Sequence, residues 1–155
     1  MSETEQKRQS RIHELLDTEK SYVDDMVLVV EVFKKPLEEQ KRLTIQELGM
    51  LFVNWNELIQ CNTKLLKAML VRKTMSGKNQ PVEQIGDILC EQLPHFTPYI
   101  RFCSCQLSAS AMLQKKIDTD PAIKDYLRNL IVWTGLYRRR LCHIRYIACF
   151  GFSPE

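Results

Sequence analysis

The stretch LGMLFVNWNELIQCNTKLLKAM, residues 48–69, decides the fold class of this 155-residue chain. Its large apolar side chains recur at steps of three and four residues and keep a seven-residue repeat for three cycles, the period of one buried helical face. Just before it, Thr44 and Glu47 match a capping box, which opens a helix. We therefore expect one long bundle helix here. Its polar seam residue, Asn62, is interpreted as a satisfied core amide or a device that fixes register.

A second apolar stripe precedes this stretch and predicts a helix over residues 5–33 that ends near Pro36. Glu19 falls on that stripe, between Leu16 and Tyr22. A carboxylate on a core stripe costs on the order of several kcal/mol if it is buried and unpaired. Three explanations stay open: Glu19 lies at the rim, pairs inside the protein, or faces a partner in a groove.

In the middle of the chain, helices are expected to be interrupted by a loop and by prolines. Residues 73–80 show no apolar periodicity and are expected to form a loop, and a helix is expected to start near Pro81. Pro94 and Pro98 should break or kink the chain, because proline cannot sit inside a regular helix.

Two more helices are expected before residue 131. The first covers residues 99–116, and Asp120-Pro121 caps the second. The apolar face expected for the first of these helices consists of Ile100, Cys103, Leu107, Ala111 and Leu113. No segment alternates with period two, so the sequence predicts an all-α, elongated helical bundle.

Size and charge narrow the class of protein. The length suits a single domain. The net charge of +3 is too small to indicate a nucleic-acid partner, and none is expected. Residues 1–130 hold 18 basic and 18 acidic residues, so the whole excess lies in residues 131–155, with four arginines and one glutamate. No secretory signal and no apolar run long enough to span a membrane occurs, so we expect a cytoplasmic protein.

The six cysteines are expected to be reduced thiols, buried or half-buried. Cys103 and Cys105 would point in different directions from a helix, and Cys142, His143 and Cys149 have no matching second ligand pair. We therefore predict no metal site and no cofactor. The chain also has no glycine-rich phosphate loop, and its three histidines stand apart from any nucleophile, so no catalytic residues for covalent chemistry are predicted.

A basic and aromatic cluster marks the last 25 residues. Arg138, Arg139, Arg140 and Arg145 are interleaved with large apolar side chains. The cluster has two readings: a weak membrane-surface or phosphate patch, or an end without a partner. The second reading is favoured, because the apolar residues there form no clean helical stripe.

Several ordered runs of residues are specific enough to compare with known families. In chain order they are Ile12-His13-Glu14-Leu15-Leu16, Thr18-Glu19 followed by Tyr22-Val23, Phe52-Val53-Asn54-Trp55, Glu57-Leu58-Ile59, Asn62 with Lys64-Leu65-Leu66-Lys67-Ala68, Val71-Arg72-Lys73, Ile85-Gly86-Asp87-Ile88-Leu89, Gln92-Leu93-Pro94-His95, and Pro98-Tyr99-Ile100-Arg101-Phe102-Cys103. In these runs the chain resembles the Dbl homology (RhoGEF) domain, most closely that of the intersectins.

The resemblance implies a function that composition and spacing do not. It implies a guanine-nucleotide exchange factor for Rho-family small GTPases, of the cell-division-control type for intersectin-like members. It also implies that Glu19 is the acid of the first helix that contacts the first switch loop of the GTPase. Such an exchange factor works by binding, without covalent chemistry, so the assignment as an enzyme stays open.

The chain departs from the family pattern after about residue 130. There the family continues into a third conserved motif, and this sequence instead reads IVWTGLYRRR, residues 131–140. We therefore expect residues 1–130 to be the N-terminal part of a Dbl homology domain, incomplete at its C-terminal end, and residues 131–155 to be a divergent tail. The alternative function is a fragment that binds or competes for a GTPase or another partner without exchange activity.

Overall fold

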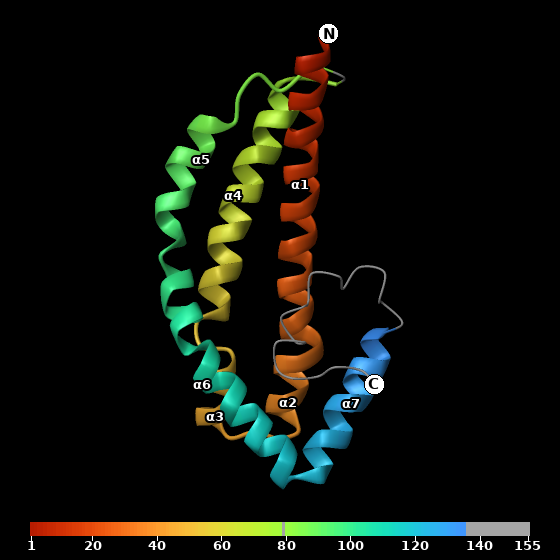
Figure 1. Cartoon of the computed structure of the whole chain (residues 1–155), viewed down its shortest axis with the longest axis vertical. Helices are drawn as coiled ribbons and strands as arrows, with labels where there is room; N and C mark the ends of the chain where they lie inside the picture. The colour runs from red at the N-terminus through yellow and green to blue at the C-terminus, as the bar shows by residue number, and fades with distance from the viewer. Residues whose placement is uncertain (79, 136–155) are drawn as a thin grey trace. The chain divides into compact units, whose positions relative to one another are not determined.

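The computed structural model of the protein describes residues 1–78 and 80–135. The regular elements within these residues are all helical, which confirms the predicted all-α class (Figure 1). In chain order they are α1 (Glu3–Val29), a π-helical turn (Val30–Lys34), α2 (Lys35–Glu39), α3 (Ile45–Leu51), α4 (Trp55–Met75), α5 (Gly86–Gln92), a 3₁₀ turn (Leu93–Phe96), α6 (Pro98–Thr119) and α7 (Pro121–Gly135).

The backbone stays helical through Pro36, the residue near which the first helix is expected to end. The π-helical turn joins α1 directly to α2, so the prediction of an end near Pro36 is wrong by a few residues. The N–H of Lys35 bonds to the carbonyl of Val30, five residues back, which widens the turn just before the proline ring. Pro36 itself lies in the first turn of α2, where no intrahelical N–H partner is required.

The single helix expected after Thr44 is in fact two helices. The capping box is confirmed: the Glu47 N–H donates to the Thr44 hydroxyl at 3.2 Å, and the Thr44 N–H donates to the Glu47 carboxylate at 2.8 Å. A turn at residues 52–54 then separates α3 from α4. The turn contains valine and asparagine, which are weak helix formers. It still buries Phe52 and Trp55, so the apolar repeat runs across the break and conceals it.

The helix expected near Pro81 begins only at Gly86, because tertiary hydrogen bonds hold the preceding backbone. Val82 is buried, and its N–H donates to the side-chain oxygen of Gln9 at 3.0 Å. Its carbonyl accepts from the Gln9 amide at 2.8 Å and from the Arg8 guanidinium at 2.9 Å. These bonds satisfy polar groups that a helix would otherwise have paired.

The helix punctuation in the second half follows the sequence closely. Pro94 lies in the 3₁₀ turn and Pro98 opens α6, which confirms the predicted interruption. Asp120 caps α7, since its Oδ1 accepts from the N–H groups of Ala122 at 3.0 Å and Ile123 at 3.4 Å. The predicted loop after α4 starts at Ser76, slightly later than expected.

Helix α6 presents apolar side chains on two sides, and the sequence assigned the wrong side to the core. Ile100 and Leu107 are 73% and 85% exposed, and Cys103 and Ala111 are exposed as well. The buried residues of α6 are Phe102, Ala109, Leu113 and Ile117, so Leu113 alone of the expected face is buried. Periodicity identifies an apolar face, but which face has a neighbour depends on the tertiary fold.

The chain divides into two compact units. The first combines Met1–Asp24 with Asn56–Tyr99, and the second combines Asp25–Trp55 with the described residues from Ile100 onward. Each unit has its own core.

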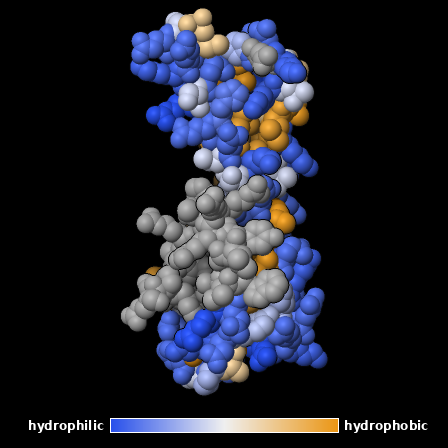
Figure 2. Space-filling model, turned by 90° about the vertical axis from the view of Figure 1, so that its right-hand side faces the viewer, coloured by the Kyte–Doolittle hydropathy of each residue, from blue (hydrophilic) through white to orange (hydrophobic). Residues whose placement is uncertain are grey.

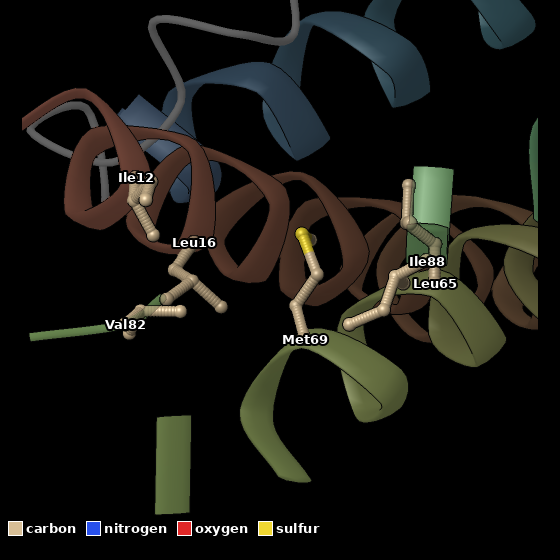
Figure 3. Close-up of a cluster of buried hydrophobic side chains, with 6 residues drawn as sticks. All are labelled: Ile12, Leu16, Leu65, Met69, Val82 and Ile88. Atoms are coloured by element: carbon tan, nitrogen blue, oxygen red, sulfur yellow. The ribbon is translucent and has the colours of Figure 1, made fainter. Parts of the chain in front are cut away.

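The core of the first unit joins α1, α4 and α5. Its six buried side chains are shown in Figure 3: Ile12, Leu16, Leu65, Met69, Val82 and Ile88. Fully burying side chains of this size contributes roughly 1.5–3 kcal/mol each. The α1 stripe predicted from the sequence is therefore packed against α4, and it fixes where Glu19 lies.

The core of the second unit centres on Trp55. Its ring meets Phe52 and Phe102 edge-on, with centroid separations of 6.1 and 5.7 Å. Its indole N–H donates to the carbonyl of Met26 at 2.9 Å. The N–H of a buried tryptophan usually has such a partner, because leaving it unpaired costs free energy.

The described surface is largely hydrophilic in the view of Figure 2, with hydrophobic side chains in separate patches. No helix in the described part of the chain is long and apolar enough to cross a membrane.

Candidate functional site

Glu19 lies within the first unit, on α1 one turn beyond the buried Leu16. The residue is half-buried, and its Oε1 atom is enclosed by protein with no hydrogen-bond partner in the described residues. Burial raises the pKa of the Glu19 carboxyl above its ordinary value, because desolvation penalises the charged form. Among residues 1–78 and 80–135, therefore, no side chain or backbone group pairs with Oε1, and this favours a rim position or a partner-facing one.

A buried thiol on α4 lies in the electrostatic field of Glu19. Cys61 is buried, and its Sγ donates to the carbonyl of Leu58 at 3.2 Å. Burial is the main cause that raises the pKa of this thiol, and the charge of Glu19 adds to it. The charge of Lys64 acts on this thiol in the opposite direction and lowers its pKa, but the raising effect of burial is the larger.

A short network of hydrogen bonds links α1, α4 and the start of α6. The Asn62 amide donates to the Leu58 carbonyl at 2.7 Å and to the Tyr99 hydroxyl at 2.6 Å. The hydroxyls of Tyr99 and Tyr22 share a hydrogen bond of 2.9 Å. Asn62 is 2% exposed, so its interpretation as a satisfied core amide is confirmed. Burial raises the pKa of Tyr99, which keeps the phenol a neutral donor and acceptor.

Tyr99 is held in place by an aromatic neighbour. The ring of Phe96 stacks on it at 5.6 Å with an interplanar angle of 7°. Phe96 itself packs against the core cluster of the first unit. Through Tyr22, the network therefore ties α1 to Tyr99 close to Glu19. Sequence reasoning missed Tyr22 and Tyr99 as network members, because their hydroxyls meet from positions 77 residues apart.

The arrangement suits the binding of a group that donates a hydrogen bond. An enclosed, unpaired carboxylate oxygen gains most from a hydrogen-bond donor that a partner supplies. His13 and His95 are both exposed, away from any such cluster. In residues 1–78 and 80–130, no group of three or more His, Cys, Asp or Glu side chains is arranged to hold a metal ion.

The predictions for the cysteines and for the basic cluster have different outcomes. Cys61 is buried and Cys105 half-buried, as expected, but Cys90 and Cys103 are exposed, so the expectation of covered thiols is wrong for those two. The remaining metal-ligand candidates and the basic cluster, at positions 138–149, lie outside the described residues.

A sequence model described as the RhoGEF domain matches residues 11–141. The chain belongs to the RhoGEF domain family. This confirms the resemblance to Dbl homology domains that was read from the ordered runs.

Related proteins give the same family. Intersectin-1 of Mus musculus is 57% identical over 130 residues, and Intersectin-2 of Mus musculus is 51% identical over 131 residues. Each match covers 84% of this chain but only 8% of the relative, so the chain spans about a twelfth of their length. Rho guanine nucleotide exchange factor 3 of Gallus gallus is 29% identical over 131 residues, which cover 84% of this chain and 24% of that protein.

A solved structure shares the fold. The crystal structure of the DH/PH domains of p115-RhoGEF superimposes with a TM-score of 0.73 at 26% sequence identity. The match covers 84% of this chain and 36% of the solved one. A helical bundle of the Dbl homology type is therefore the fold of this RhoGEF domain.

Proposed function

We propose that this RhoGEF domain promotes guanine-nucleotide exchange on Rho-family small GTPases and that Glu19 is one of its contacts with the GTPase. The observation that carries the proposal is the half-buried Glu19, whose Oε1 finds no hydrogen-bond partner among the described residues, in a chain of the RhoGEF family. Membership of that family favours exchange over the alternative of a competing fragment without exchange activity.

Glu19 would act by accepting a hydrogen bond from the GTPase. A charge-assisted hydrogen bond to a desolvated carboxylate contributes roughly 1.5–3 kcal/mol. The polar network of Asn62, Tyr99 and Tyr22 holds α1 in place before binding. Binding therefore costs little conformational entropy at this site. Such a contact favours whichever switch conformation presents the donor.

Exchange then follows from differential binding. Switch loops of small GTPases are ordered by contacts to the nucleotide phosphates and Mg²⁺. A domain that prefers the nucleotide-free arrangement weakens nucleotide binding by the same coupling free energy that the nucleotide exerts on the domain. Each tenfold effect corresponds to about 1.4 kcal/mol, so a thousandfold effect requires a coupling of about 4 kcal/mol.

The finer parts of the proposal concern the partner and the location. The resemblance to intersectins favours a GTPase of the cell-division-control type. A cytoplasmic location is part of the same proposal. For the last 25 residues the favoured reading stays an end without a partner, and a weak contact of the arginines at positions 138–140 with a membrane surface is the alternative. The division of the chain at residue 130 into a Dbl homology part and a basic, aromatic tail also belongs to this proposal.

Release of a fluorescent GDP analogue tests the proposal. The chain is mixed with purified GTPases of the cell-division-control type and of two other Rho branches, each loaded with the analogue. We expect faster release from a Rho-family GTPase, most for the first type, and none from a GTPase outside the Rho family. Tight binding to the nucleotide-free GTPase without any acceleration would instead support the competing fragment.

A further inference from the structure

The outer face of α4 combines lysines with exposed aliphatic side chains. Lys64, Lys67, Val71 and Met75 follow one another at steps of three and four residues, so they share one helical face. Both lysines are exposed, and Val71 and Met75 are 57% and 78% exposed. Leu70, at the flank of this face, is 39% exposed. We call these five residues the α4 stripe.

The stretch of sequence that contains the α4 stripe carries charged residues of a single sign. No acidic residue occurs between Glu57 and Glu83, whereas this interval contains five basic residues. One of them, Arg72, is engaged: its guanidinium bonds to Asp87 at 2.6 Å and to the Gln84 carbonyl at 2.7 Å. The other four, which are Lys64, Lys67, Lys73 and Lys78, are exposed and form no ion pair with any described residue.

We propose that the α4 stripe binds an anionic lipid surface, with its lysines at the headgroups and Val71 and Met75 in the interfacial layer. Charge complementarity selects an anionic surface, because unpaired lysines are point charges that need no fixed partner geometry. The exposed aliphatic side chains gain from entering the acyl boundary. A nucleic acid is a poorer occupant, because the α4 stripe offers no aromatic ring for base stacking and no free arginine.

The contribution of each lysine sets the size of the effect. A basic residue close to an anionic membrane strengthens partitioning about fivefold, and the gain decays within a Debye length. Removing the charges of Lys64 and Lys67 is therefore expected to weaken binding about 25-fold. Raising the salt concentration should also weaken the binding of the wild-type protein to anionic vesicles.

The test uses the whole chain and vesicles of phosphatidylcholine with or without phosphatidylserine, in a co-sedimentation assay without any GTPase. We expect binding to the phosphatidylserine vesicles only, strongly reduced in the K64Q/K67Q variant and reduced several-fold in V71T/M75Q. The matched controls are K115Q/K124Q, which changes exposed lysines of α6 and α7, and L107Q, which changes an exposed leucine. Both controls should bind like the wild type.

Four results would overturn the proposal. The first is binding that does not depend on phosphatidylserine, and the second is an equal loss in K64Q/K67Q and in its control. The third is a loss confined to an R138Q/R139Q/R140Q variant, which would assign the contact to the tail. Capture of an oligonucleotide or of polyglutamate by the wild type alone, without vesicle binding, would also reject a lipid partner. None of these outcomes depends on exchange activity, so the two proposals fail separately.

Discussion

Replacing Glu19 with glutamine is expected to stabilise the protein near neutral pH. The Oε1 atom of Glu19 is enclosed and bonds to no group in the part of the chain that the structure describes, and burial raises the pKa of the carboxyl. Enclosing a charged carboxylate costs more than enclosing the neutral amide of glutamine, because the charged form loses more hydration. Because Glu19 is only half-buried, water screens part of this cost, and we expect a gain of about 1 kcal/mol. For a chain of this length the melting temperature should rise by roughly 2–4 °C.

The pH dependence of this gain has a definite sign. The folded state raises the pKa of Glu19 above 4.5, so the neutral carboxyl is the form that the fold favours. Its contribution to stability is fully present below about pH 4.5 and is lost as the pH rises through the folded-state pKa. The difference between the glutamine variant and the wild type should therefore be small near pH 4 and grow toward pH 7.

Thermal unfolding followed by circular dichroism measures this difference. The matched control is Asp17→Asn, which removes an exposed carboxylate from the same helix. We expect the control to show no comparable growth of its stability difference with pH. A glutamine variant that is less stable than the wild type at pH 7, or a difference that does not change with pH, would refute the reasoning from burial of Glu19.

Three further substitutions test the hydrogen bonds that organise the two units, each by urea-induced unfolding. Gln9→Ala removes both side-chain bonds to the buried backbone of Val82 and should cost about 3 kcal/mol. Tyr99→Phe removes the acceptor of the Asn62 amide and should cost about 1–2 kcal/mol. Thr44→Ala removes the N-cap of α3 and should cost about 1 kcal/mol.

Each of these three predictions can be contradicted by a measurement. A Gln6→Ala variant, which changes an exposed glutamine of α1, is the control for the first and should be close to neutral. If Gln9→Ala matched it, the tether to Val82 would be dispensable. An unchanged stability of Tyr99→Phe would mean that the network adds no net stability, and a neutral Thr44→Ala would mean that α3 does not depend on its cap.

Local signals in the sequence predicted the helices and two of their starts. Thr44 with Glu47 and Asp120 with Pro121 act within a few residues, so their geometry is encoded where they occur. The break between α3 and α4 was missed because Phe52 and Trp55 stay buried across it, and the apolar repeat therefore shows no gap.

The remaining errors come from contacts between distant residues. The backbone of Val82 is held by Gln9, 73 residues away, and no local pattern indicates that bond. Likewise, Ile100 and Leu107 read as a core face of α6, but the fold places its neighbours on the opposite side. At the candidate site, the position of Glu19 on an apolar stripe could be predicted, and the supporting hydroxyl of Tyr99 could not.

The rate of GDP release from a Rho-family GTPase, compared between the wild type, Glu19→Gln and Asp17→Asn, tests the central claim most directly. Loss of one charge-assisted hydrogen bond of about 1.5–3 kcal/mol corresponds to a roughly 10- to 100-fold slower accelerated rate. We predict that loss for Glu19→Gln, in a protein that is folded and slightly more stable, and a wild-type rate for Asp17→Asn. Equal acceleration by the wild type and Glu19→Gln would contradict the role of Glu19, and no acceleration by the wild type would contradict the exchange function itself.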